Sequence, residues 1–469
     1  MALWPIFRPA AAPFHPPGMN DRMNPSPWKV AAGICLLSAI FATGEDLPHP
    51  TPVVGFEMPD EVDAPVDPDE NALAVFDDYS WRAFIAINWP ARPAIRGVPD
   101  EAKKIGDFSV PGTKVVWATW KADYELLPQE GMEPTEWSSF DDFTPCRALP
   151  FEGSGHVEVL SSFSSFRDFN QAGNGRLGGP LVAQNHTYVR FEVRLNQVEF
   201  NFIRDQQLYR KSRLPSAGSP RLRFPDNSVA VKAAWRIIKE DELPAAQGRY
   251  YMVDAMVLDP ATKTCKLQKV GLVGLHIVQK TPTRPQWVWS SFEHIDNVPE
   301  PGRTPSIGRR FSFNDPSRPQ MLDPSTAPPP ISNSNPPLVN PRATQVIRIK
   351  KIADSTRKTN DDYRALLRGT VWENYQLVMT QWPKYPQPEE ENGAPFPGQF
   401  TGPEPMTNIA NTTMETYLQS NVSTSCMACH DAARRKGTDF VWFLPLRAIA
   451  DGKQSRNPLI IPPARRSFP

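Results

Sequence analysis

KLQKVGLVGLHIVQKTPTRPQWVWSSFEH, residues 266–294, contains two runs rich in β-branched and aromatic residues, separated by a short loop with two prolines. Such runs, bounded by turn residues, are typical of the two strands of a β-hairpin. We predict strands over 266–278 and 286–294, joined by a loop at 281–285. The hairpin would contribute two long strands to a β-sheet.

The register of this hairpin decides where its two histidines lie. If Lys280 pairs with Gln286, the side chains of His276 and His294 lie on one face, and both tryptophans of 286–294 lie on the other. A shift of one residue would place the histidines on opposite faces, because neighbouring residues of a strand alternate between faces.

Other apolar runs indicate further strands, and two of them, 189–195 and 229–237, have a clear two-residue period. They cover 115–120, 189–195, 229–237 and 249–258. Before them, residues 77–90 place Trp81, Phe84 and Ile85 at helical spacing, and Pro90 ends the predicted helix. The region as a whole is predicted to be β-rich.

Composition sets the broad class of the protein. Its 469 residues allow two or three domains, and 53 prolines favour loops and short strands over a helical bundle. Lysine plus arginine equals aspartate plus glutamate, at 51 residues each, so no net field attracts nucleic acid or an acidic membrane surface.

The N-terminus has the pattern of an export signal. Basic residues precede an apolar run at 30–42, which is too short to span a bilayer, and small residues follow at 42–44. We expect cleavage near Glu45 and delivery to the periplasm, with translation starting at Met19 or Met23. The alternative is an uncleaved segment, which would then be the protein's only contact with the membrane.

Cys426-Met427-Ala428-Cys429-His430 is the motif that carries chemistry. A Cys-x-x-Cys-His run suits covalent haem attachment, in which two thiols add to the porphyrin vinyl groups and the histidine ligates the iron. A structural zinc site would need a second pair of ligands, and no other Cys-x-x-Cys occurs. A thioredoxin-like dithiol would have no role for the histidine. We therefore expect one haem c.

Around this motif we predict a helical region. Its expected helices are one with an apolar stripe from Tyr363 to Met379, one after Asn411 and one capped by Ser425 and closed by Gly437. The expected fold is α+β, with a β-rich N-terminal and central domain followed by a small, mainly α haem c domain. The segments are 1–44 (signal peptide), 45–75 (acidic, proline-rich lead-in), 76–313 (β-rich domain), 314–345 (proline-rich linker or strap) and 346–469 (haem domain).

The C-terminal portion, about 361–450, resembles c-type cytochromes in its haem-binding motif. The whole chain resembles large bacterial cytochrome c family proteins with a single C-terminal motif, in the stretches 79–90, 274–297, 371–383 and 411–430. The resemblance implies that Cys426 and Cys429 are the thioether attachment points and His430 is the proximal ligand.

The sixth iron ligand is not evident. Small cytochromes c take a methionine from downstream of the motif, but this chain has no Met, His or Cys after His430. Met414 is the first candidate upstream, and His294 is a weaker one. Met379, Met406 and His276 are also within reach in sequence, and core packing is the ordinary role of each of these residues.

Cys146 and Cys265, the remaining cysteines of the exported chain, are candidates for a disulfide in an oxidising compartment. Two separately buried thiols are the alternative.

Three functions fit these features. An exported mono-haem electron carrier needs a redox partner protein and no nucleic acid. A haem c peroxidase or oxidase would have an open distal site facing the β-rich domain, with His276, His294 or Arg284 acting on bound peroxide. A sensing module would use an aromatic surface to recognise a ligand. On the evidence of the sequence, we favour the electron carrier.

Overall fold

The computed structural model of the protein describes residues 49–64, 72–110, 112–126, 133–140, 158–160, 179–216, 219–259, 264–301, 308–320, 335–383, 400–401, 410–419 and 426–448. All of them belong to one compact unit, Leu47–Pro469. The predicted export signal at 1–44, Cys146, Met406 and Ser425 lie outside the described residues. The cleavage site and the Cys146–Cys265 disulfide therefore stay predictions.

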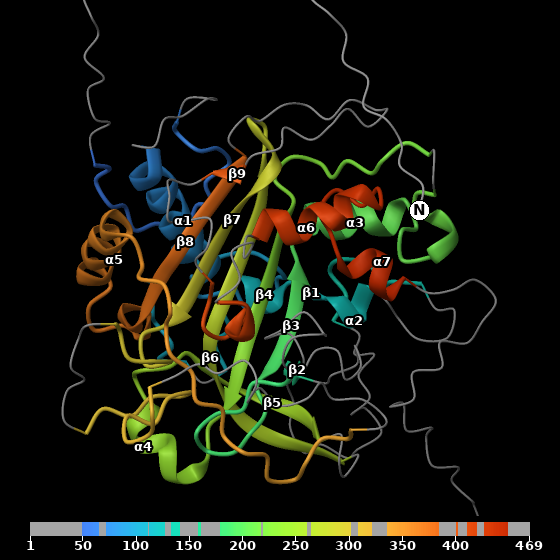
Figure 1. Ribbon diagram of the computed structural model, residues 1–469. Helices are drawn as coiled ribbons and strands as arrows, with labels where there is room; N and C mark the ends of the chain where they lie inside the picture. Colours follow the sequence, from blue (N-terminus) through green and yellow to red (C-terminus); the bar gives the residue numbers. More distant parts are fainter. Residues whose placement is uncertain are drawn as a thin grey trace, which may run out of the picture. The chain divides into compact units, whose positions relative to one another are not determined.

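Nine strands of the described residues form one sheet (Figure 1). They are β1 (Lys121–Ala122), β2 (Glu158–Leu160), β3 (Arg190–Leu195), β4 (Val229–Ile237), β5 (Met252–Asp259), β6 (Thr264–Thr281), β7 (Arg284–His294), β8 (Tyr375–Pro383) and β9 (Phe400–Thr401). Seven lie in the order β1-β3-β4-β6-β7-β8-β9, with antiparallel neighbours, while β5 pairs with β6 and β2 pairs parallel to β5. The strands predicted over 189–195, 229–237, 249–258, 266–278 and 286–294 are confirmed.

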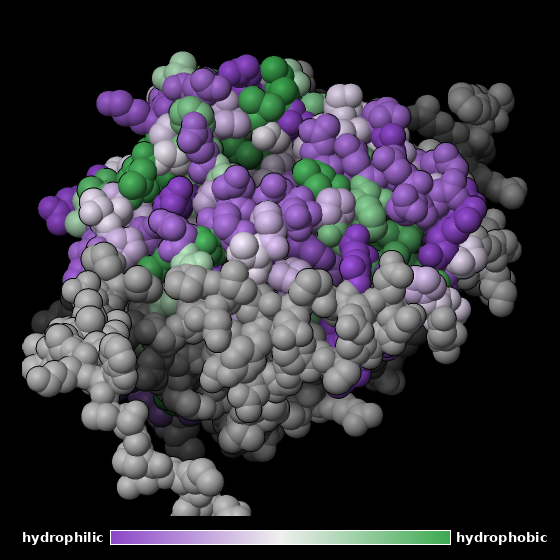
Figure 2. Space-filling view, turned by 90° about the horizontal axis from the view of Figure 1, so that it is seen from above, coloured by the Kyte–Doolittle hydropathy of each residue, from purple (hydrophilic) through white to green (hydrophobic). Residues whose placement is uncertain are grey.

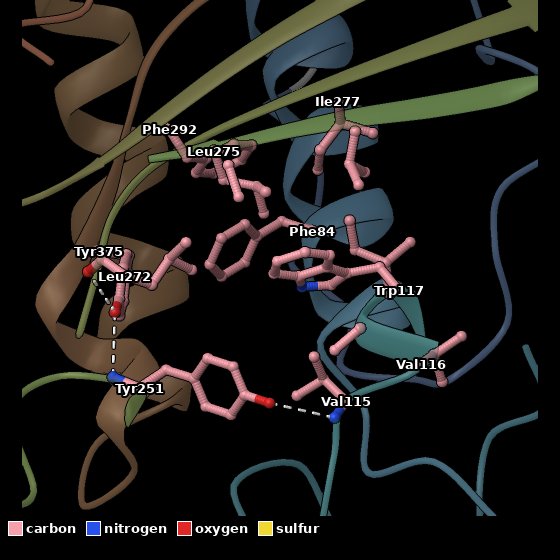
Figure 3. Close-up of a cluster of buried hydrophobic side chains, with 14 of the residues drawn as sticks. Phe84, Val115, Val116, Trp117, Tyr251, Leu272, Leu275, Ile277, Phe292 and Tyr375 are labelled. Carbon is pink, nitrogen blue, oxygen red and sulfur yellow. Dashed lines mark hydrogen bonds between the residues drawn. The ribbon is translucent and has the colours of Figure 1, made fainter. Parts of the chain in front are cut away.

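Helices cover both faces of the sheet. They are α1 (Leu73–Ile87), α2 (Asp123–Leu126), α3 (Gln197–Asp205), α4 (Leu243–Ala246), α5 (Asp354–Leu366), α6 (Cys426–Arg435) and α7 (Phe443–Arg447). Helix α1 forms where it was predicted, and its apolar stripe packs on one face against Leu275, Ile277 and Phe292 (Figure 3). We call this the α1 face. The opposite face, under α6, is the α6 face.

The hairpin register differs from the expected one by one residue. Gln279 pairs with Val288, and a bulge follows before Thr281 pairs with Arg284. Trp287 takes a positive φ of 70° next to this bulge. Between these two pairings β6 has one residue and β7 has three, so the bulge adds two residues to β7 and does not by itself exchange the two faces. Beyond the bulge His276 pairs with Ser291 instead of Ser290, which puts His276 and His294 on opposite faces. The pairing of Lys280 with Gln286, under which His276 and His294 would share a face, is therefore not the one formed, and the one-residue alternative holds.

Three predicted elements have another structure. Residues 115–120 contain a 3-10 turn, η2 (Trp117–Thr119), instead of a strand. The helix predicted through Met379 ends at Leu366, because Gly369 turns the chain with a φ of +84°, and η8 (Val371–Asn374) and β8 follow. After Asn411 the chain forms turns and η10 (Thr416–Leu418), without an α-helix.

The predicted boundary at 345 does not separate two compact units. Strand β8, from the expected haem domain, pairs with β7 of the β-rich region. The end of the proline-rich stretch is a strap, because the Pro341 carbonyl lies 3.0 Å from Nδ1 of His186, and the Thr344 amide donates to Val182 O at 3.0 Å. A mixed α+β fold is confirmed, with the motif helix lying on the sheet itself.

The exposed surface is mixed in polarity. In the view of Figure 2, hydrophobic residues of the described part form small groups among hydrophilic ones. None of the helices in the described ranges is long and apolar enough to cross a membrane.

Candidate functional site

Helix α6 carries the motif and rests on the sheet. Its first residue, Cys426, donates its backbone N–H to Oε1 of Gln381 on β8 at 2.9 Å. Met427 is fully buried in a cluster that includes Trp289, while Cys429 is exposed. Because residues three and four apart share one side of a helix, Cys426, Cys429 and His430 lie along the same side.

One ring nitrogen of His430 makes a hydrogen bond, which fixes the orientation of the ring. Its Nδ1 lies 2.7 Å from the carbonyl oxygen of Phe440. A carbonyl only accepts, so Nδ1 carries the proton and the lone pair lies on Nε2. Within the described ranges no hydrogen bond to Nε2 is found. Burial, aided by the positive charge of Lys232, lowers the pKa of His430 to about 4, so the imidazole is neutral. A neutral imidazole oriented through Nδ1 is the form in which histidine ligates metals.

The turn that supplies the Phe440 carbonyl is held in place by an ion pair and a hydrogen bond of Asp439. Asp439 and Phe440 take positive φ values of 44° and 68°, and such a φ is costly for a bulky residue such as Phe440. The Asp439 carboxylate accepts from Nζ of Lys280 at 2.6 Å and from the Phe224 backbone N–H at 2.8 Å. Both side chains of the ion pair are buried. The pair therefore holds the strained turn in the position that orients His430.

Asp439→Ala should lower the free energy of unfolding by about 3–5 kcal/mol, because the Lys280 ammonium would be left buried without its partner. Asp439→Asn is the matched control, since its amide oxygen can still accept from the Phe224 N–H, and it should cost less. Urea unfolding of each variant measures the difference. Equal midpoints for Asp439→Ala and the native protein would contradict this account of the turn.

Glu199 lies near the same turn without a hydrogen bond to its carboxyl oxygens among the described residues. It is fully buried on α3, and burial, followed by the charge of Asp439, raises its pKa to about 8. The carboxyl is therefore neutral at pH 7. Because the folded-state pKa is raised above the ordinary 4.5, the resulting stabilisation is complete below about pH 4.5 and is lost as the pH rises through 8.

Glu199→Gln should remove this pH dependence. Relative to the native protein, the variant should gain roughly 2–4 kcal/mol of stability between pH 5 and pH 9, because the amide never ionises. Denaturant unfolding at the two pH values measures the change. A constant difference between variant and native protein across this range would show that Glu199 ionises alike in the folded and unfolded states.

The two candidate sixth ligands named first lie on different faces of the sheet, Met414 on the α6 face beside Gly274 and His294 on the α1 face. Met414 is buried in a cluster with Val273 and Phe313, and its methyl group lies 3.5 Å from where a Cβ on Gly274 would be. His294 is buried on the α1 face and bonds through Nε2 to Arg249 O at 2.9 Å. Its Nδ1 accepts from the Asp296 N–H at 3.0 Å. Both positions favour packing roles.

Other residues do lie beside the motif. Lys232, His276, Ser291 and Met379 form a continuous cross-strand row over β4, β6, β7 and β8. In the next row, Val278, Trp289 and Gln381 pair across β6, β7 and β8. His430 packs on Trp289 with ring centroids 4.5 Å apart, and Gln381 holds the start of α6. Residues directly paired or two apart share a face, so His276 and Met379 lie on the α6 face.

The arginines at the end of α6 pair within the helix. Arg434 and Arg435 contact Asp431 at 2.6 and 2.8 Å. Gly437 closes the helix with a φ of +86°, as predicted. Arg284, proposed to act on peroxide, lies at the turn of the hairpin with its guanidinium 5.3 Å from the ring centroid of Phe76.

No protein-family model, curated protein or solved structure matches this chain. No group of three or more His, Cys, Asp or Glu side chains within the described ranges is placed to hold a metal ion.

Proposed function

We propose that this protein is a c-type haem protein that transfers electrons. Cys426 and Cys429 would hold one haem through thioether bonds, and Nε2 of His430 would ligate its iron. The supporting observation is the 2.7 Å contact of His430 Nδ1 with the Phe440 carbonyl, which leaves the lone pair of the imidazole on Nε2. The donor set of two thiols and one neutral imidazole fits haem c.

Electron transfer needs a haem edge near the surface. Cys429 is exposed, while Cys426 is partly buried against the sheet. A porphyrin bonded to both would have one edge toward solvent and another against protein. When bound, the haem would supply a one-electron ferric–ferrous couple whose potential depends on its axial ligands and burial. The partner would be another redox protein, and we place the exchange in the periplasm because of the predicted export signal.

The test is a mass measurement of protein matured in a host that attaches haem c, followed by a redox titration. We expect one haem per chain and reversible one-electron reduction. A mass without haem, or zinc in its place, would refute the proposal.

A second candidate function is a haem c peroxidase or oxidase. It is favoured by the position of His276, which lies on the α6 face, whereas His294 lies on the α1 face.

A further inference from the structure

Three side chains that can carry charge lie together beside the motif: Lys232, His276 and Glu415. Lys232 and His276 are directly paired across β4 and β6. Nε2 of His276 lies 3.6 Å from Oε1 of Glu415, an ion-pair distance. Glu415 belongs to the segment 410–419, so two distant parts of the chain build this cluster.

The backbone around the cluster is shaped to bring Glu415 onto the sheet. A Cβ on Gly274 would lie 2.2 Å from Oγ1 of Thr413, so only glycine lets the 411–413 turn approach β6 so closely. The other carboxyl oxygen of Glu415 accepts from the Asn411 N–H at 3.0 Å. Glu415 is thereby fixed beside His276, which lies two residues along β6 from Gly274.

The cluster interacts with each functional side chain of the motif. Besides burial, which is the largest cause, the charge of Glu415 raises the pKa of both the Cys426 and the Cys429 thiols. Lys232 contributes to the low pKa of His430, and His430 to that of His276. His276 lies one cross-strand row from Trp289, on which the ring of His430 packs, so the cluster and the motif share one region of the molecule.

His276 and Glu415 are suited to proton transfer. The side chain of His276 is 13% exposed, but its Nε2 is buried and has no hydrogen bond among the described residues. Burial lowers the pKa of His276, which keeps the imidazole neutral. A neutral imidazole can accept a proton, and the adjacent carboxylate stabilises the imidazolium that results.

We propose that His276 and Glu415 form a proton-accepting pair that allows the haem to bind a small protic ligand of the hydrogen peroxide class. This inference rests on the proposed haem attachment at Cys426 and Cys429. Hydrogen peroxide and hydrogen cyanide are weak acids that are mostly neutral at pH 7, but each binds ferric iron best as its anion. A haem held at the motif would supply the ferric iron. When HOOH became HOO⁻ or HCN became CN⁻, the pair would take up the one proton released. No electron is transferred in this step.

The probe is cyanide, mixed at pH 7 with the ferric protein carrying its covalent haem. His276→Leu should slow the second-order association about 100-fold, because the proton then has no acceptor at the site. Glu415→Gln should slow it less, since the imidazole remains. His186→Asn is the matched control. Nδ1 of His186 contacts the Pro341 carbonyl, and the backbone φ of His186 is +61°, a value that asparagine tolerates. The substitution of His186 should therefore leave the association rate unchanged. His276→Gln serves as a second variant if leucine prevents folding.

Equal association rates for the native protein and both His276 variants would overturn the inference. So would a native ferric spectrum with a sulfur-to-iron band that disappears in Met379→Leu, because a Met379 thioether would then fill the sixth position. Mass separates this failure from failure of the proposed function. Protein with haem but without the rate effect refutes the pair alone, whereas protein without haem refutes both.

Discussion

Protein with both Cys426 and Cys429 changed to alanine should carry no covalent haem after maturation in a host that attaches haem c. The thiols are the only atoms of the motif that can bond the porphyrin vinyl groups, so the effect is complete loss. Denaturing mass spectrometry measures it directly. Cys429→Ala alone should leave at most one thioether bond, and Cys265→Ala, which changes a cysteine on strand β6, should keep the full haem content.

His430→Ala completes this series. Some thioether attachment should persist, because both thiols remain, but the proximal ligand and the native ferric spectrum should be lost. Attached haem with an unchanged spectrum would mean that another residue ligates the iron and that the Phe440 hydrogen bond orients His430 for another reason.

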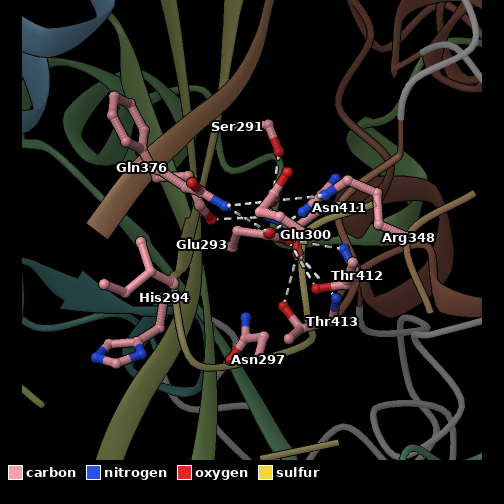
Figure 4. Close-up of polar contacts among 12 residues, drawn as sticks. Ser291, Glu293, His294, Asn297, Glu300, Arg348, Gln376, Asn411, Thr412 and Thr413 are labelled. Carbon is pink, nitrogen blue, oxygen red and sulfur yellow. Dashed lines mark hydrogen bonds and ion pairs between the residues drawn. The ribbon is translucent and has the colours of Figure 1, made fainter. Parts of the chain in front are cut away.

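Glu293→Ala should destabilise the fold by about 3–5 kcal/mol, because it breaks a buried ion pair and leaves one charge without its partner. Glu293 pairs with Arg348, and both side chains are at most 1% exposed (Figure 4). The second carboxylate oxygen of Glu293 accepts from the backbone N–H and the hydroxyl of Thr412, at 3.0 and 2.7 Å. This one side chain therefore ties β7 to the segment that carries Arg348 and to the 411–413 turn.

Two controls make the Glu293 result specific. Glu300→Ala removes a carboxylate that is 18% exposed and leaves the Glu293–Arg348 pair in place, so it should cost less. The double variant Glu293→Leu with Arg348→Met should recover much of the lost stability, because no unpaired charge is left buried. Denaturant unfolding of the four proteins tests this. A Glu293→Ala variant as stable as the native protein would show that solvent reaches Arg348.

Local pattern predicted much of the sheet because strand formation here depends on alternating side chains. The runs at 229–237 and 286–294 became β4 and β7 with nearly the expected bounds. The prediction of a helix through Met379 was wrong, because a buried strand with apolar residues on both faces has no two-residue period. The apolar residues of β8, among them Val378 and Met379, therefore fit a helical stripe equally well.

The sequence by itself determined the chemistry of the motif, since the spacing of Cys426, Cys429 and His430 depends only on neighbouring residues of one helix. Tertiary structure alone decided what surrounds it. The register of the β6–β7 hairpin, in which His276 pairs with Ser291, placed His276 on the α6 face and His294 on the other. Lys232 and Glu415, far from the motif in sequence, joined the site because β4 pairs with β6 and the 411–413 turn rests on Gly274. Such long-range contacts depend on the packing of the whole sheet, which the local sequence pattern does not encode.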